Sequence, residues 1–161
     1  MTEDITQLAQ LLGITLSAKG WQVTCAESCT GGGVGYAITS ISGSSAWFKK
    51  GFITYSNEAK QELLGVCEDT LIKHGAVSAK TVEEMAAGAA KHANAEVAIA
   101  ISGIAGPDGG TPDKPVGTVW FGFFISGKII SQKQLITGNR QAVRIKAIEL
   151  ALSNSLMLLQ K

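Results

Sequence analysis

The chain has 161 residues, of which 45% are hydrophobic and 17% are charged, and its formal net charge is +1. This length suits one folded domain over residues 1–161, and the composition excludes both a disordered chain and a basic surface for nucleic acid. Apolar runs are shorter than the roughly 20 residues that cross a membrane, and the acidic N-terminus is unlike a signal peptide, so we expect a cytoplasmic protein that binds no membrane.

The first half of the chain predicts helices that alternate with strands. Apolar residues at helical spacing open the sequence, and Gly20 is a good stop for that first helix. The small residues that follow Thr30 would let a second helix pack close to a sheet. The elements predicted up to residue 74 are a helix over 2–19, a strand over 21–27, a helix over 30–41, a strand over 47–55, and helices over 57–64 and 69–74.

The second half continues this alternation and adds a hairpin. Ser78 can cap a helix that runs to Ala93, and the nearly continuous apolar run over 96–102 is typical of a buried parallel strand. Ser126-Gly127 lies between two apolar segments, which indicates a hairpin. The last helix, over 140–159, carries two apolar stripes, which indicates deep burial or a subunit contact. The pattern predicts an α/β fold with helices on both faces of one sheet.

Cysteine and histidine spacing does not predict a metal site. Cys25 and Cys29 lie four residues apart without a second pair, and Cys67 is distant in sequence. We interpret His74 and His92 as isolated residues on helix surfaces. An odd number of cysteines fits free thiols in a reducing cytoplasm.

All three prolines, Pro107, Pro112 and Pro115, lie in one glycine-rich loop over 103–117. This loop follows the buried strand at its carboxyl end, which is where open α/β sheets bind ligands. A rigid connector is the alternative. The length and stiffness of the loop favour a ligand-binding wall.

The stretch AESCTGGG, residues 26–33, also lies at the carboxyl end of a strand and before a helix. The first amides of a helix have no internal partners and can bind a phosphate or an oxyanion. The stretch matches neither a P-loop nor a nucleophile elbow. Ser28 is a possible nucleophile, and Cys29 is either a second one or, as we prefer, a small core residue.

A serine nucleophile needs a base, and Lys60 is the best candidate. It lies in the first turn of a predicted helix, where the helix dipole disfavours its charged form, and burial would lower its pKa further. Local sequence alone favours instead an exposed lysine paired with Glu58 or Glu62. Tyr55 could line the same cleft or be a core tyrosine, and Arg140 could bind a phosphate or be a surface charge.

Four long motifs follow one another along the chain, and together they are more specific than the residue spacings considered so far. They are AESCTGGGVG, ISGSSAWFKKGFITYSNEAKQELLGV, SGIAGPDGGTPDKPVGTVWFG and GNRQAVR. With them the chain resembles, over nearly its whole length, the CinA C-terminal domain family of competence/damage-inducible proteins, and within it the stand-alone nicotinamide-nucleotide amidohydrolases. The resemblance implies a three-layer α/β/α sandwich with a mixed, mostly parallel sheet, and a homodimer. It implies deamidation of nicotinamide mononucleotide to nicotinic acid mononucleotide and ammonia in pyridine nucleotide salvage, without a metal or other cofactor.

The resemblance also assigns site residues. The nucleophile falls on Ser28, the general base on Lys60 and a further catalytic residue on Tyr55, while Asn139 stands where the family pattern has Asp. Ser45 matches a serine that could relay between lysine and nucleophile. We expect oxyanion stabilisation by amides around 29–31. The expected substrate-binding residues, which include those for ribose and phosphate, are Thr30, Gly31, Gly32, Ser45, Gly103, Ala105, Gly106 and Arg140.

Three other kinds of function stay open from the sequence. A nucleotide-binding module without catalysis would use the same glycine-rich walls. An interaction protein would use the last helix for a partner other than itself. A metal-assisted hydrolase using Asp108 and Asp113 is a weaker third option.

Overall fold

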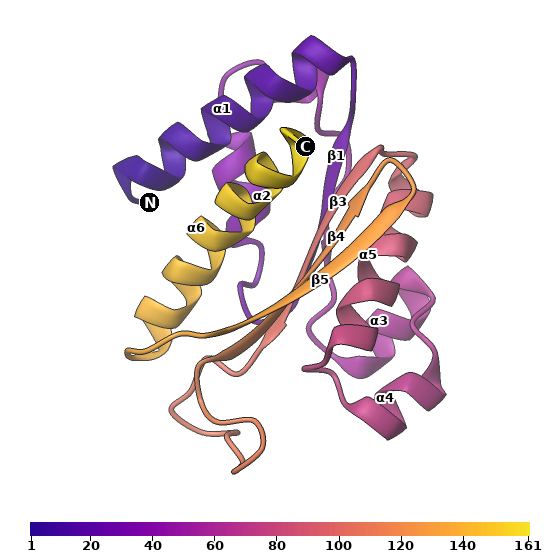
Figure 1. Ribbon diagram of the computed structural model, residues 1–161, viewed down its shortest axis with the longest axis vertical. Coiled ribbons are helices and arrows are strands. Elements are labelled where there is room, and N and C mark those ends of the chain that lie inside the picture. Colours follow the sequence, from indigo (N-terminus) through magenta and orange to yellow (C-terminus); the bar gives the residue numbers. More distant parts are fainter.

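A five-stranded mixed sheet forms the centre of the molecule, seen in a computed structural model that describes residues 1–161 (Figure 1). The strands are β1 Val23–Glu27, β2 Phe52–Ile53, β3 Val97–Gly103, β4 Thr118–Ile125 and β5 Lys128–Leu135. Their order across the sheet is β2-β1-β3-β4-β5. β1 runs parallel to both β2 and β3, whereas β4 is antiparallel to β3 and to β5. The predicted hairpin is the β4–β5 pair.

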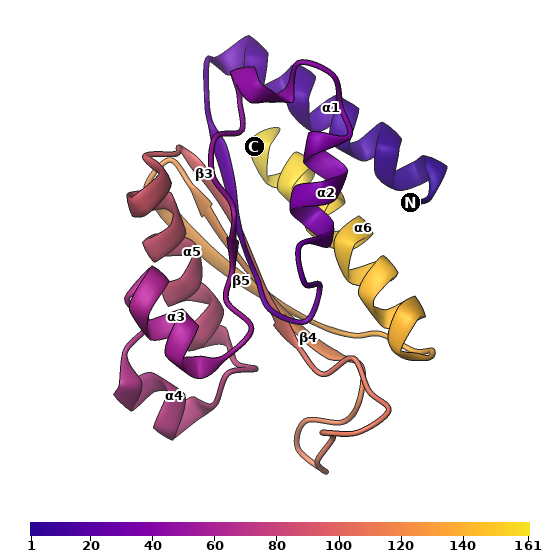
Figure 2. The same ribbon diagram turned by 180° about the vertical axis from the view of Figure 1, so that it is seen from behind.

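Helices cover both faces of this sheet, which confirms the three-layer α/β/α fold (Figures 1 and 2). One face is covered by α1 Glu3–Lys19, α2 Gly33–Thr39 and α6 Arg140–Leu159. The other face is covered by α3 Asn57–Leu64, α4 Glu68–His74 and α5 Ala79–Ala93. A short 3-10 turn, η1 Ser44–Ala46, lies between α2 and β2. No helix is both long enough and apolar enough to cross a membrane.

Alternation along β1 decides which side chains meet which helices. Cys25 belongs to the buried cluster formed with α1, α2 and α6, and Ala26 belongs to the cluster on the α5 side. Because side chains alternate along a strand, Glu27 faces α2 and Ser28, the next residue, faces α3. The sheet register therefore directs the serine and the preceding carboxyl group to opposite faces.

Small residues bring α5 and α3 close to the sheet. The buried face of α5 carries three alanines, Ala86, Ala89 and Ala90, beside Val82 and Met85. At Gly88 a Cβ atom would overlap the carbonyl oxygen of Leu64, the last residue of α3. Glycine at this position therefore permits the close packing that holds α3 beside the carboxyl end of β1.

Two predicted elements beside the site are shorter than the sequence pattern indicates, and β1 also begins two residues later than the strand predicted over 21–27. α2 begins at Gly33, not at Thr30, because Gly31 and Gly32 have φ angles of 59° and 97°, which a right-handed helix cannot contain. The strand predicted over 47–55 pairs only at Phe52–Ile53, apart from a single bridge at Phe48, because it lies at the edge of the sheet with one neighbour. Both short elements lie next to the site described below.

The last helix buries residues from both of its apolar stripes. Leu152 and Leu156, from the stripe that runs from Ile145 to Leu159, pack in the cluster shared with α1. Val143 and Ala147, from the other stripe, are fully buried in the same cluster, whereas Met157 at the end of that stripe is 55% exposed. Burial in the core therefore explains most of both stripes.

Candidate active site

Ser28 and Lys60 meet at the carboxyl end of β1. Lys60 Nζ lies 3.1 Å from Ser28 Oγ, and it donates a second hydrogen bond to the carbonyl oxygen of Thr54 at 2.8 Å. Ser28 is 8% exposed and Lys60 only 1%. The two side chains come from segments 32 residues apart in sequence, so only the folded sheet brings the lysine to the serine.

Local structure fixes both groups. The Ser28 amide donates to the carbonyl oxygen of Ile101 at 3.0 Å, which extends the pairing of β1 with β3 by one residue. Lys60 lies in the first turn of α3, whose start is capped by the Ser56 hydroxyl accepting from the Ala59 amide at 3.0 Å. The helix start is therefore held firmly beside the end of β1.

Burial is the main influence on the charge of Lys60. Removal from water lowers the pKa of Lys60, and the nearby Cys29 opposes this only weakly. No ion pair joins Lys60 to Glu58 or Glu62, so the exposed, paired lysine that local sequence favours does not occur. A buried lysine without a carboxylate partner is suited to act as a neutral base.

The neighbouring thiol is the weaker nucleophile. Burial raises the pKa of Cys29 to about 11, so this side chain stays a protonated thiol at neutral pH. Burial also raises the pKa of Cys25. Both cysteines lie in the apolar cluster on the α2 side of the sheet, as expected for small core residues.

A cavity of about 230 Å³ opens beside the Ser28–Lys60 pair. It lies where β1 and β3 end, as the sequence predicts for a ligand site in this fold. The residues that line it are Ser28, Cys29, Tyr55, Asn57, Lys60, Ala76, Val77, Ser102, Gly103, Ala105 and Arg140. The glycine- and proline-rich loop thus contributes a wall of the cavity at Gly103 and Ala105.

Arg140 and Tyr55 stand together at this cavity. Arg140 Nη1 donates to the carbonyl oxygen of Gly106 at 2.9 Å, and Nη2 donates to the Tyr55 hydroxyl at 3.2 Å. Tyr55 is 62% exposed, which excludes the core role considered for it. Asn139 does not orient the arginine, because its side-chain oxygen accepts from the Ala142 amide at 2.9 Å and caps α6.

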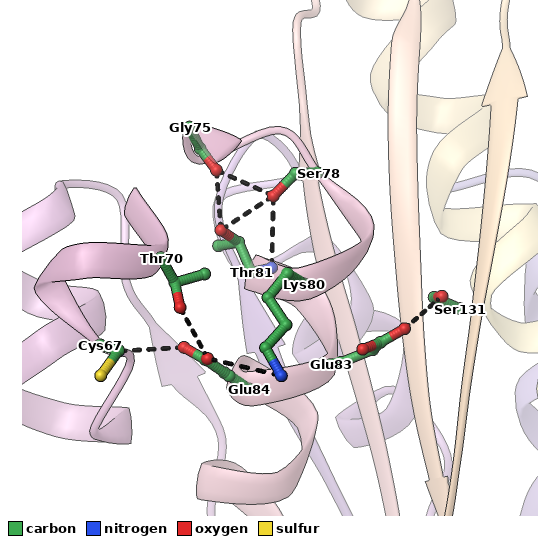
Figure 3. Close-up of polar contacts among 9 residues, drawn as sticks. All are labelled: Cys67, Thr70, Gly75, Ser78, Lys80, Thr81, Glu83, Glu84 and Ser131. Carbon is green, nitrogen blue, oxygen red and sulfur yellow. Dashed lines mark hydrogen bonds and ion pairs between the residues drawn. The ribbon is translucent and has the colours of Figure 1, made fainter. Parts of the chain in front are cut away.

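Another part of the cavity wall, Ala76 and Val77, belongs to the connection between α4 and α5. Figure 3 shows the polar contacts that hold this connection. The hydroxyl groups of Ser78 and Thr81 both donate to the carbonyl oxygen of Gly75, at 2.9 and 2.7 Å. Glu84 of α5 accepts from the Cys67 amide at 3.0 Å and so caps α4, which anchors the wall from the other side.

Five of the expected substrate-binding residues do not line the cavity, and one of them, Gly106, reaches it only through its hydrogen bond with Arg140. Ser45 lies in η1 near the amino end of β1, because the segment after it runs parallel to β1 from Val23 onward. It is therefore at the wrong end of the strand to relay between Lys60 and Ser28, which contact each other directly. Thr30, Gly31 and Gly32 do not line the cavity either, and the Thr30 hydroxyl donates to a Glu27 oxygen at 2.7 Å.

Further residues at the site are not recognised from the sequence, among them Asn57, Ala76 and Val77 in the cavity wall. Ser102 is buried and lines the cavity next to Ser28. Glu27 is 1% exposed and Arg144 binds the loop after β1, as described below. A carboxyl group at the buried end of a strand, and an arginine one helical turn after Arg140, are the signals that could have indicated the last two. Asp108 and Asp113 lie exposed outside the cavity.

Comparison with known proteins gives the family. The model of the CinA C-terminal domain matches residues 5–159. The chain belongs to the CinA C-terminal domain family. A CinA-superfamily structure from Klebsiella pneumoniae superposes on this CinA C-terminal domain with a TM-score of 0.94, at 40% identity over 97% of this chain and 98% of the other. The protein CihA from Agrobacterium tumefaciens gives 0.95 at 39% identity, over 100% and 98%.

Curated relatives of this CinA C-terminal domain carry the name of an enzyme. It is 57% identical to nicotinamide-nucleotide amidohydrolase PncC of Enterobacter agglomerans over 93% of this chain and 92% of the relative. It is 48% identical to the protein of that name from Pseudomonas putida, over 97% and 98%. These relatives are therefore similar over nearly their full length.

Proposed function

We propose that this protein hydrolyses the carboxamide of nicotinamide mononucleotide to give nicotinic acid mononucleotide and ammonia. Near-full-length similarity to proteins named nicotinamide-nucleotide amidohydrolase supports this substrate. The observation that carries the chemistry is a lysine amine, 1% exposed, at 3.1 Å from a serine hydroxyl that opens into a cavity. This arrangement is a nucleophile with its base.

Acylation begins when neutral Lys60 accepts the proton of Ser28. The Thr54 carbonyl holds one N–H of the amine, so the nitrogen lone pair is free to face Ser28 Oγ. Ser28 Oγ then bonds to the carboxamide carbon, and the carbonyl electrons move to oxygen. When the tetrahedral intermediate collapses, the C–N bond breaks and protonated Lys60 gives its proton to the leaving ammonia.

Deacylation repeats these steps with water. Lys60, neutral again, takes a proton from a water molecule whose oxygen attacks the acyl carbon. The bond to Ser28 Oγ breaks, the proton returns to Ser28, and the carboxylic acid product leaves. One base therefore serves both halves of the reaction.

Substrate orientation follows from the size and charge of the site. A cavity of about 230 Å³ is smaller than the roughly 300–1,000 Å³ typical of sites that enclose a whole drug-sized ligand. We place the nicotinamide ring inside it and the ribose and phosphate toward Tyr55 and Arg140. The Arg140 guanidinium has five N–H groups and uses two of its nitrogens on Tyr55 and Gly106, which leaves donors for phosphate.

Ammonia release tests this function. We expect the wild-type protein to release ammonia from the mononucleotide much faster than from nicotinamide riboside or free nicotinamide. Arg140→Ala should raise KM for the mononucleotide roughly 10- to 100-fold, the value of a charged hydrogen bond of about 1.5–3 kcal/mol, and leave the riboside rate nearly unchanged. Equal rates on all three compounds would contradict the phosphate contact, and tight binding without ammonia would indicate a non-catalytic nucleotide-binding module.

The compartment, the oligomeric state and the cofactor requirement of this enzyme stay predictions from the sequence and the family resemblance. We propose a cytoplasmic homodimer that requires no cofactor. The open edge of β2, with Ile53 56% exposed, and the exposed Tyr36 on α2 offer apolar surface for a second copy.

A further inference from the structure

Arg144 of α6 holds the loop that carries Ser28 from the face opposite Lys60. Its Nε donates to the carbonyl oxygen of Cys29 at 3.0 Å, and its Nη2 donates to that of Thr30 at 3.2 Å. A Cβ atom at Gly31 would lie 3.3 Å from Nη2, so the loop passes directly over the guanidinium group. Two successive carbonyl groups are therefore turned toward α6.

This contact sets the direction of the amide that follows. In a trans peptide the C=O and N–H bonds point in opposite directions. Because the Cys29 carbonyl points to Arg144, the N–H of Thr30, in the same peptide, points away from α6. The amides of Cys29 and Thr30 have no acceptor within the chain, whereas the Gly31 amide donates to the Ser28 carbonyl at 3.0 Å. Two donors next to the nucleophile are thus left without a partner.

Glu27 removes the competing donors at the start of α2. Its carboxyl oxygens accept from the amides of Val34 at 2.8 Å and Gly35 at 3.0 Å, and from the Thr30 hydroxyl. The first amides of α2 are therefore occupied and cannot serve a ligand. Of the unpartnered amides that precede α2, that of Cys29 belongs to a residue that lines the cavity, so it is the one placed to bind negative charge on a ligand.

We infer that Arg144 is a positioning residue that fixes the Cys29–Thr30 peptide, and with it the turn after Ser28, so that the amide of Cys29, which lines the cavity, binds the oxyanion of the tetrahedral intermediate. This inference rests on the proposed function. When Ser28 Oγ attacks, the carbonyl electrons of the carboxamide move to its oxygen, and the Cys29 N–H stabilises the new charge. Loss of one oxyanion donor in comparable sites lowers kcat about 10²- to 10³-fold.

The test compares Arg144→Ala and Arg144→Lys with Lys146→Ala, a change at an exposed lysine on the same helix that pairs with Glu149 and makes no hydrogen bond to the loop. We expect both Arg144 variants to lose kcat about 100-fold or more with little change in KM, and Lys146→Ala to keep wild-type kcat. A loss of turnover alone could come from a structural fault, so each protein is also assayed on thionicotinamide mononucleotide. Sulfur accepts hydrogen bonds poorly, so the wild-type enzyme should turn over the oxygen substrate faster than the sulfur substrate. The ratio of these two rates should be smaller in the Arg144 variants.

An unchanged oxygen-to-sulfur preference in Arg144→Lys would overturn the inference. A crystal structure of Arg144→Lys gives a second readout that needs no activity, and a Cys29–Thr30 peptide that keeps the wild-type orientation would also overturn it. If the wild-type enzyme releases no ammonia, the proposed function fails, while the orientation of this peptide still tests the role of Arg144.

Discussion

Lys60 shows how burial at a single residue can supply a base at neutral pH. Its amine is held between the Thr54 carbonyl and the Ser28 hydroxyl, with no carboxylate to stabilise a positive charge. Removal from water then lowers the pKa of Lys60. Because the same burial disfavours the protonated form, the group that serves catalysis should also cost stability.

Stability should therefore depend on pH in a direction fixed by this residue. Between the lowered native pKa of Lys60 and its ordinary value of about 10.4, the unfolded chain binds a proton that the native protein does not, so unfolding becomes harder as pH rises. Relative to Lys60→Met, the wild-type protein should gain up to about 1.4 kcal/mol per pH unit in this window and nothing below it. Urea unfolding of both proteins from about pH 6 to pH 10 measures the difference.

Lys91→Met is the matched control, because Lys91 is exposed on α5. Its free energy of unfolding should follow that of the wild-type protein at every pH. Parallel curves for the wild-type protein and Lys60→Met would show that Lys60 keeps its ordinary pKa, and would remove the basis for a neutral amine.

The chemistry of single residues is only partly predictable from sequence. Local pattern favours an exposed Lys60, and the resemblance to a family is what selects it as a base. Burial is the missing information, since it depends on α5 and β1 closing over α3. Ser45 illustrates the converse, because a matching motif places it in the site while the parallel register of the following segment carries it to the far end of β1.

At the scale of elements, the site depends on how closely α3 lies to α5. Local signals define these helices well: the bounds of α3 agree with the prediction, since Ser56 caps its start and Gly65 follows its end. The distance between α3 and α5 is not defined by such local signals. It depends on Gly88, where any side chain would meet the Leu64 carbonyl, and no periodicity in the sequence marks that contact.

Gly88→Ala should disturb both stability and catalysis. The added methyl group must push α3 away from α5, which we expect to cost about 1–3 kcal/mol and to move Lys60 away from Ser28. Gly35→Ala is the control, because its Cβ would meet Glu27 Oε2 at an ordinary 3.6 Å. Thermal unfolding and kcat measured on both variants test this, and a Gly88→Ala protein as stable and as active as Gly35→Ala would contradict the packing argument.

At the scale of the whole molecule, the site joins segments that the sequence keeps far apart. The end of β1, the start of α3, the loop after β3 and the start of α6 meet only because β1 and β3 pair in parallel with both carboxyl ends at one edge. The alternation of helices and strands predicts that edge and its proline-rich loop. It does not predict that Arg140 reaches back to Gly106 and Tyr55, since that contact depends on where α6 begins relative to the sheet.

The most direct test of the account is ammonia release from nicotinamide mononucleotide by the wild-type protein, Ser28→Ala and Cys29→Ala. We predict steady turnover by the wild-type protein, a loss of more than about 10³-fold in kcat for Ser28→Ala, and retention of most activity by Cys29→Ala, whose thiol is protonated at neutral pH. A Ser28→Ala variant that turns over at the wild-type rate would contradict the proposal that Ser28 is the nucleophile.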